Sequence, residues 1–139
     1  MSHMAAQALV KTLLITNSNL GAGTVTEGDY TVLDSGHIYS AVLNPGAFGR
    51  HELAEMTRER PWTVLVDLFA KFSDDTTYSA LGTLRDSIIE TLKGGRCLSS
   101  IYVINGIESD QDPQEVFDRQ SNGPFFVMQT LRLTLDEYI

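Results

Sequence analysis

The stretch that decides the fold is residues 62–72, WTVLVDLFAKF. Every second position, starting at Trp62, is apolar, and the positions between them are mixed in character. This period-two alternation predicts a β-strand with one buried face. The apolar set is Trp62, Val64, Val66, Leu68, Ala70 and Phe72, and the mixed set is Thr63, Leu65, Asp67, Phe69 and Lys71. Asp67 is therefore expected on the open face of a sheet.

A helix is expected directly after this strand. Residues 73–76, Ser-Asp-Asp-Thr, offer N-cap side chains and negative charge. Apolar residues then recur every three or four positions, which predicts the main helix over about 76–93. Its buried stripe would be Leu81, Leu84, Ile88, Ile89 and Leu92. Gly94 and Gly95 would end this helix, one of them in the left-handed conformation.

The rest of the chain predicts shorter elements. Residues 5–16 form a short helix with an apolar stripe of Leu9, Val10, Leu13 and Leu14. Residues 29–33 and 38–43 predict two strands joined by a hairpin turn at 34–36. Strands are also expected at 98–107 and 125–138, loops at 17–28 and 108–122, and a helical turn or an extended loop at 50–60.

This order of elements predicts an α+β fold. The sheet is expected to be mostly antiparallel, with the main helix and the short N-terminal helix packed on one face. The 139 residues contain no internal repeat or linker, which predicts one domain over residues 5–139. Residues 1–4, MSHM, resemble residues left by a cloning vector. No apolar run approaches the roughly 20 residues that cross a membrane, and no secretory leader is expected at the start.

The charge balance limits the partners. Eighteen acidic and 10 basic residues give a formal net charge of -8, which argues against binding the phosphate backbone of a nucleic acid. Such a charge suits solubility or contact with a basic partner surface. The single cysteine, Cys97, excludes an internal disulfide and a zinc site of several thiolates. Cys97 is expected to be a small buried residue at the start of a strand.

No motif in the chain predicts a catalytic residue, a cofactor or a metal ligand. Residues 20–24, LGAGT, are similar to a dinucleotide-binding loop, but Thr26 replaces the third glycine and a strand-like segment follows. His3, His37 and His51 lack metal-ligand spacing. The acidic run from Glu108 onward lacks the glycine and terminal glutamate of a calcium loop, and it is interpreted as a solvated loop.

Several segments together resemble a known family in their order. These are WTVLVDLF at 62–69, the acidic helix start at 73–78, Gly94-Gly95, the strand from Leu98, an acidic loop, NGPFFVMQ at 122–129 followed by Leu131 and Leu133, the terminal Glu137-Tyr138, and a Pro-Gly break before Ala47-Phe48. The order resembles small tail proteins of siphophages and prophages, of the tail terminator or minor tail protein U type. The resemblance covers roughly residues 30–139.

The resemblance implies a structural, non-enzymatic role. Proteins of this type form rings, typically hexameric, that cap the tail tube, stop its polymerisation and face the head–tail connector. They belong to the virion tail and assemble in the bacterial cytoplasm. An acidic chain could line a lumen that DNA passes through, or dock against a basic neighbour. The two long loops are the expected subunit contacts, with candidate residues Asn17, Leu20, Thr24, Glu108, Asp110, Asp112, Glu115 and Asp118.

Two other classes of function stay open at the level of sequence. One is a small ligand- or peptide-binding adaptor domain, which would be monomeric. The other is a small α+β enzyme, which would need polar groups converging in a pocket, for instance around Asp67, His37 and His51.

Overall fold

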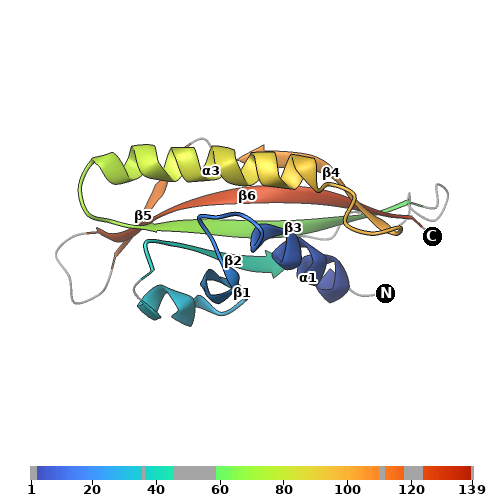
Figure 1. The fold of residues 1–139 in the computed structure, drawn as a ribbon, viewed down its shortest axis with the longest axis horizontal. Coiled ribbons are helices and arrows are strands. Elements are labelled where there is room, and N and C mark those ends of the chain that lie inside the picture. The colour runs from blue at the N-terminus through green and yellow to red at the C-terminus, as the bar shows by residue number, and fades with distance from the viewer. Residues whose placement is uncertain (1–2, 36, 46–58, 110–111, 118–123, 139) are drawn as a thin grey trace.

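A computed structural model describes residues 3–35, 37–45, 59–109, 112–117 and 124–138. It has the predicted α+β fold, with a mostly antiparallel sheet and two α-helices (Figure 1). The elements are α1 (His3–Leu14), the 3-10 helix η1 (Ala22–Thr24), β1 (Val25–Glu27), the 3-10 helix η2 (Tyr30–Ser35), β2 (Tyr39–Pro45), β3 (Glu59–Lys71), α3 (Thr76–Gly94), β4 (Tyr102–Ser109), β5 (Gln114–Phe117) and β6 (Pro124–Tyr138).

The sheet is built around its two longest strands, β3 and β6. They pair antiparallel along their whole length, from Glu59 opposite Tyr138 to Lys71 opposite Phe126. The strand order is β1-β2-β3-β6-β4, and β5 also pairs with β6. Because β3 occupies one side of β6, β4 and β5 share the other side and pair with its two halves in turn. The described sheet therefore ends in β1 on one side and in β4 on the other.

Both α-helices cover one face of the sheet, as predicted, and this face holds the main core. The alternation in β3 is confirmed, since Val64, Val66, Leu68 and Ala70 all point into this core and are at most 1% exposed. The predicted stripe of α3 packs against them, with four of its five residues buried and Ile89 half-buried. Helix α1 joins the same core through its buried residues, which are Ala6, Val10 and Leu14.

The opposite face of the sheet is only partly covered. Helix η2 lies over one end of it and closes a second, smaller apolar cluster of Val32, Val42, Phe69 and Phe126. The positions of β3 and β6 that continue this face carry Leu65, Asp67, Thr130 and Arg132, none of which is fully buried. We call this surface the open face. Asp67 lies on it, as predicted.

The predicted hairpin at residues 29–43 is wrong. Its second strand is β2, but its first strand is the helix η2, and β1, which was expected to be loop, pairs parallel with β2. The cause is local. The Asp29 carboxylate accepts hydrogen bonds from the Thr31 amide at 2.9 Å and from the Thr31 hydroxyl at 2.6 Å. This turn starts a helix and overrides the β-preference of the Tyr-Thr-Val sequence that follows.

Two further predictions around β4 need correction. Cys97 is exposed, because the strand begins only at Tyr102 and Cys97 pairs through a single bridge with Val103. The loop expected at 108–122 is interrupted, because Glu108 and Ser109 complete β4 and Gln114–Phe117 is the strand β5. Residues 50–58 of the predicted 50–60 segment lie outside the described residues, and Glu59 begins β3.

The end of α3 also differs from expectation. Gly95 has a φ of -116° and Gly94 has no positive φ either, so the predicted left-handed cap at one of the two is wrong. A Cβ atom at Gly95 would instead collide with the Leu13 side chain of α1. The glycine is therefore needed for the close approach of the two helices rather than for its backbone conformation.

Candidate functional site

The first predicted interface loop, residues 17–28, is packed into the molecule. The Asn17 amide donates hydrogen bonds to the hydroxyls of Ser87 at 3.0 Å and Thr91 at 2.9 Å, both on α3. Leu20 is 2% exposed and belongs to the core. Thr24 is half-buried and donates to the Gly21 carbonyl. Asn17 and Leu20 thus hold this segment against the helices, and the predicted contact role of the loop stays a prediction.

The second predicted loop is more accessible. Glu108 in β4, Asp112, and Glu115 in β5 are exposed, while Asp110 and Asp118 lie outside the described residues. The Tyr78 hydroxyl of α3 donates a hydrogen bond to the Glu115 carboxylate, and this bond raises the pKa of Tyr78. Glu115 therefore ties β5 to the helix layer, whereas Glu108 and Asp112 are available at the surface.

A group of four polar side chains occupies the middle of the open face. The Asp67 carboxylate accepts hydrogen bonds from the Tyr30 hydroxyl at 2.8 Å and from the Thr130 hydroxyl at 2.7 Å. The Asn44 amide donates to the Tyr30 oxygen at 2.6 Å. Burial and the bond to Asp67 raise the pKa of Tyr30. Both oxygens of Asp67 are thus engaged, and the group fastens η2 to β3 and β6.

Of the polar groups named for an enzyme, the two that the structure describes, Asp67 and His37, do not lie together. The Lys71 amide donates to the carbonyl of Ile38, so neighbouring His37 lies about four strand residues, or roughly 13 Å, from Asp67. His51 lies outside the described residues. Across the described ranges, no three His, Cys, Asp or Glu side chains come together as metal ligands.

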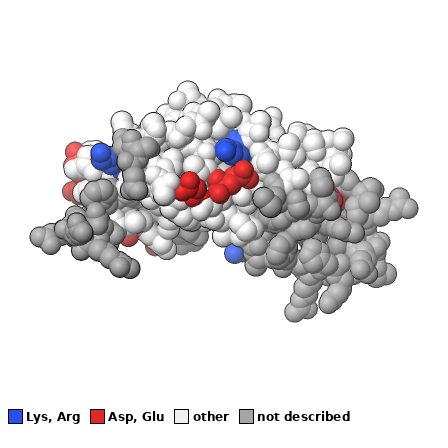
Figure 2. Space-filling view, turned by 90° about the horizontal axis from the view of Figure 1, so that it is seen from below, with Lys and Arg blue, Asp and Glu red and all other residues white. Residues whose placement is uncertain are grey.

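Exposed side chains of opposite charge lie near the two edge strands of the described sheet, β1 and β4. The side of the molecule that carries β1 and β2 is largely uncharged, with a group of acidic side chains near its middle and a basic one beside it (Figure 2). Glu27 and Asp29, at the end of β1 and just after it, are exposed. At the other end of the sheet, beside β4, Lys93 and Arg96 are exposed.

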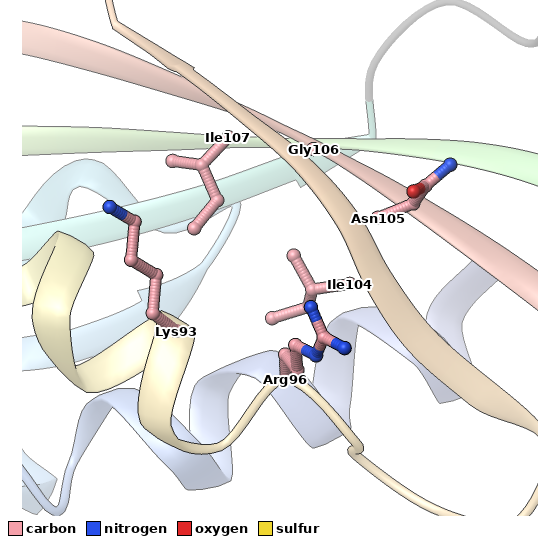
Figure 3. A pocket seen from close by; sticks show the side chains of 6 residues that line it. All are labelled: Lys93, Arg96, Ile104, Asn105, Gly106 and Ile107. Atoms are coloured by element: carbon pink, nitrogen blue, oxygen red, sulfur yellow. The ribbon is translucent and has the colours of Figure 1, made fainter.

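A hollow of about 420 Å³ lies beside β4. Ile104 and Ile107 point from β4 toward the end of α3 and form its apolar floor (Figure 3). Lys93, in the last turn of α3, and Arg96, just beyond it, border the hollow with two positive charges. Asn105 also borders the hollow, but its side chain points away from Lys93 (Figure 3). The arrangement suits an acidic group carried on an apolar or extended segment.

The outer edge of β4 is covered over only part of its length. Residues 96–98 pair with its beginning, where the Ile104 amide donates to the Arg96 carbonyl at 2.8 Å and the Leu98 amide donates to the Tyr102 carbonyl at 3.0 Å. The pairing of β4 with β6 then shifts at Asn105. From Asn105 to Ser109, no strand of the described chain pairs with this edge. An uncovered edge of this kind can accept another strand.

Sequence reasoning missed Lys93 and Arg96 as possible site residues. They flank Gly94-Gly95, and the whole segment was interpreted only as the end of a helix. The available signal was the pair of basic residues in an acidic chain. The basic pair indicates a possible binding site only once α3 is known to end beside the uncovered part of β4.

Comparison with known proteins assigns no function. No protein-family model matches the chain, and the search of curated proteins found no match. No described helix is both long enough and apolar enough to cross a membrane.

Proposed function

We propose that the protein is a structural component of a bacteriophage tail, a terminator or completion protein that forms a ring, caps the tail tube and joins it to the head connector. Its site of action is then the virion tail, and its partners are further copies of itself, the tail-tube protein and the connector. The sequence resemblance over roughly residues 30–139 motivates the proposal.

The observation that carries the proposal is the uneven covering of the sheet. Both α-helices lie on one face, whereas the open face and the 105–109 edge of β4 remain accessible. An accessible strand edge is a common place for chains to associate. The polar groups on the open face bind one another and leave no carboxylate oxygen of Asp67 unpaired. Assembly accounts for this arrangement better than catalysis does.

The acidic composition fits the same role. A net charge of -8 in a ring around the path of DNA would repel the phosphate backbone and keep the lumen free of bound nucleic acid. Exposed acidic residues such as Glu108 and Asp112 could equally meet a basic neighbour in the tail. Both uses require assembly rather than a pocket.

A second candidate is a peptide-binding adaptor domain. The hollow beside β4 and the uncovered edge next to it favour this reading, because an extended peptide can add to a sheet edge while a side chain fills a neighbouring hollow. An adaptor would bind its peptide as a monomer, and this property separates it from a ring-forming protein.

The proposal is tested by growing tail tubes from purified tube subunits in the presence and absence of the protein. The expected result is a shortened length distribution in negative-stain images, with the protein located at tube ends. The matched control is the same preparation after heat denaturation. Tubes that grow to the same lengths with and without the folded protein would contradict the terminator role.

A further inference from the structure

Lys93 and Arg96 beside β4 are opposite in charge to Glu27 and Asp29 at the end of β1, and all four are exposed. Glu108, also in β4, is paired opposite Arg132 of β6 and borders the open face with it. We infer that the β4 edge binds the β1 edge of a second copy, with Lys93 and Arg96 receiving Glu27 and Asp29. This inference rests on the proposed ring and names the surfaces that would close it.

The receiving surface combines three features within a short distance. Residues 105–109 offer an uncovered strand edge, Ile104 and Ile107 supply an apolar floor, and Lys93 and Arg96 supply two positive charges. Arg85 and Asp86 form an ion pair, and no ion pair of Lys93 or Arg96 with a described residue is found. The two cations at the hollow therefore have no carboxylate within ion-pair distance in their own described chain.

The matching surface lies at the other end of the sheet. The Glu27 carboxylate is held in place by the Gln7 amide at 3.3 Å. The hydrogen bonds from Thr31 lower the pKa of Asp29, so this group is fully ionised near neutral pH. Both side chains are exposed. This surface can present two negative charges to a neighbour.

The position of these surfaces determines the kind of assembly. A twofold contact of the β4 edge with itself would bring four positive charges together. Contact between unlike edges avoids this repulsion and repeats in one direction from copy to copy. Such a head-to-tail contact gives a closed ring when the rotation between copies closes. A compact ring is what the proposed function requires.

The test reverses the charge of one edge at a time. The first variant carries Lys93→Glu and Arg96→Glu, and the second carries Glu27→Lys and Asp29→Asn. Asparagine at position 29 keeps an acceptor oxygen for Thr31, so helix η2 is preserved. The control variant carries Lys71→Glu and Glu90→Lys, two exposed positions that are on neither edge. Melting temperatures check that all variants fold.

Light scattering over a concentration series measures the assembly of each protein. We expect each edge variant to need about tenfold more protein for half-assembly than the wild type, because the substitutions replace attraction between the two edges by repulsion. The control should assemble like the wild type.

Mixing the two edge variants is the decisive step. One variant then has two acidic edges and the other has two edges of net positive charge, so an alternating ring places unlike charges at every contact, with Asp29→Asn as the one neutral position. Recovery of assembly in the mixture supports the inference. Rings that persist equally in both variants, or a mixture that stays monomeric, would overturn the edge assignment and leave the proposed function standing. A wild-type chain that is monomeric at every concentration would overturn the ring as well.

Discussion

The two faces of the sheet are formed by the same strands but differ in how completely their side chains are buried. On β3, the side chains that face the helices are almost completely buried, whereas Leu65 and Asp67 on the open face are only partly buried. The helix face is mostly apolar, with Gln129 of β6 as a buried polar exception, while the apolar cluster of the open face lies beneath η2. Stability is therefore expected to come mainly from the helix face, and the open face is less completely covered.

The largest difference in stability between the two faces is expected when a leucine on each face is replaced by alanine. Leu133, on the helix face of β6, is 0% exposed, and Leu65 lies half-buried on the open face of the adjacent strand. We expect Leu133→Ala to lower the free energy of unfolding by about 2–5 kcal/mol, and Leu65→Ala by less than about 1 kcal/mol. Urea denaturation of both variants measures this, and equal losses would contradict the comparison.

A smaller effect is expected at Asn17, which ties the segment after α1 to α3. Replacement by alanine removes the bonds to Ser87 and Thr91 from a site where Asn17 is 8% exposed. We expect Asn17→Ala to lower the free energy of unfolding by about 1–3 kcal/mol. Asn19→Ala, at an exposed position two residues later, is the control and should stay within about 0.5 kcal/mol of the wild type.

The polar group on the open face should matter less. Tyr30 is 45% exposed, and its hydroxyl bonds Asp67 and Asn44. We expect Tyr30→Phe to lower the free energy of unfolding by about 0.5–1.5 kcal/mol. The substitution removes hydrogen bonds at a partly exposed position, where water can replace the lost partner. Thermal denaturation gives the value. A loss as large as that of Leu133→Ala would mean that the open face contributes as much stability as the core.

The smallest effect at neutral pH is expected at Tyr102, which is buried on the helix face. The residue is 2% exposed, and its hydroxyl has no hydrogen-bond partner in the described part of the chain. Tyr102→Phe removes only this unpaired hydroxyl, so stability should change by less than about 1 kcal/mol or rise. Urea denaturation at pH 7 checks this, and a large loss would show that the hydroxyl has a partner.

At alkaline pH, the wild type and Tyr102→Phe should differ in stability. Burial, with the nearby Glu137 carboxylate as a second cause, raises the pKa of Tyr102. The unfolded chain releases this proton near pH 10, before the folded chain does, so stability is full below about pH 10 and falls above it. The wild type should therefore lose more stability than Tyr102→Phe between pH 8 and pH 11. An equal loss in both proteins would contradict the assigned cause.

The sequence predicted the elements whose own pattern is long enough to determine them. β3, α3 and β6 each carry an apolar periodicity over more than ten residues, and all three were found close to their expected bounds. β1 and β5 are three and four residues long, and they become strands only by pairing with β2 and β6. Helix η2 begins at hydrogen bonds to one side chain, Asp29, and a search for repeating apolar positions does not detect such a local bond.

The candidate site was less predictable than the fold. Lys93, Arg96 and residues 104–107 are separated along the chain by a turn, and they form one hollow only because α3 ends beside the uncovered edge of β4. Asn17 and Leu20 were named as surface contacts because the segment is rich in small polar residues. Their burial depends on α3, more than sixty residues later, and local composition carries no information about it.

Native mass spectrometry of the wild-type protein over a concentration series tests the central claim, that the chain assembles into a closed ring, most directly. The account predicts monomer at low concentration and one dominant closed species, a hexamer by the resemblance, at high concentration, with rings in negative-stain images of the same sample. Monomer at every concentration, or an open ladder of oligomers that never closes, would contradict it.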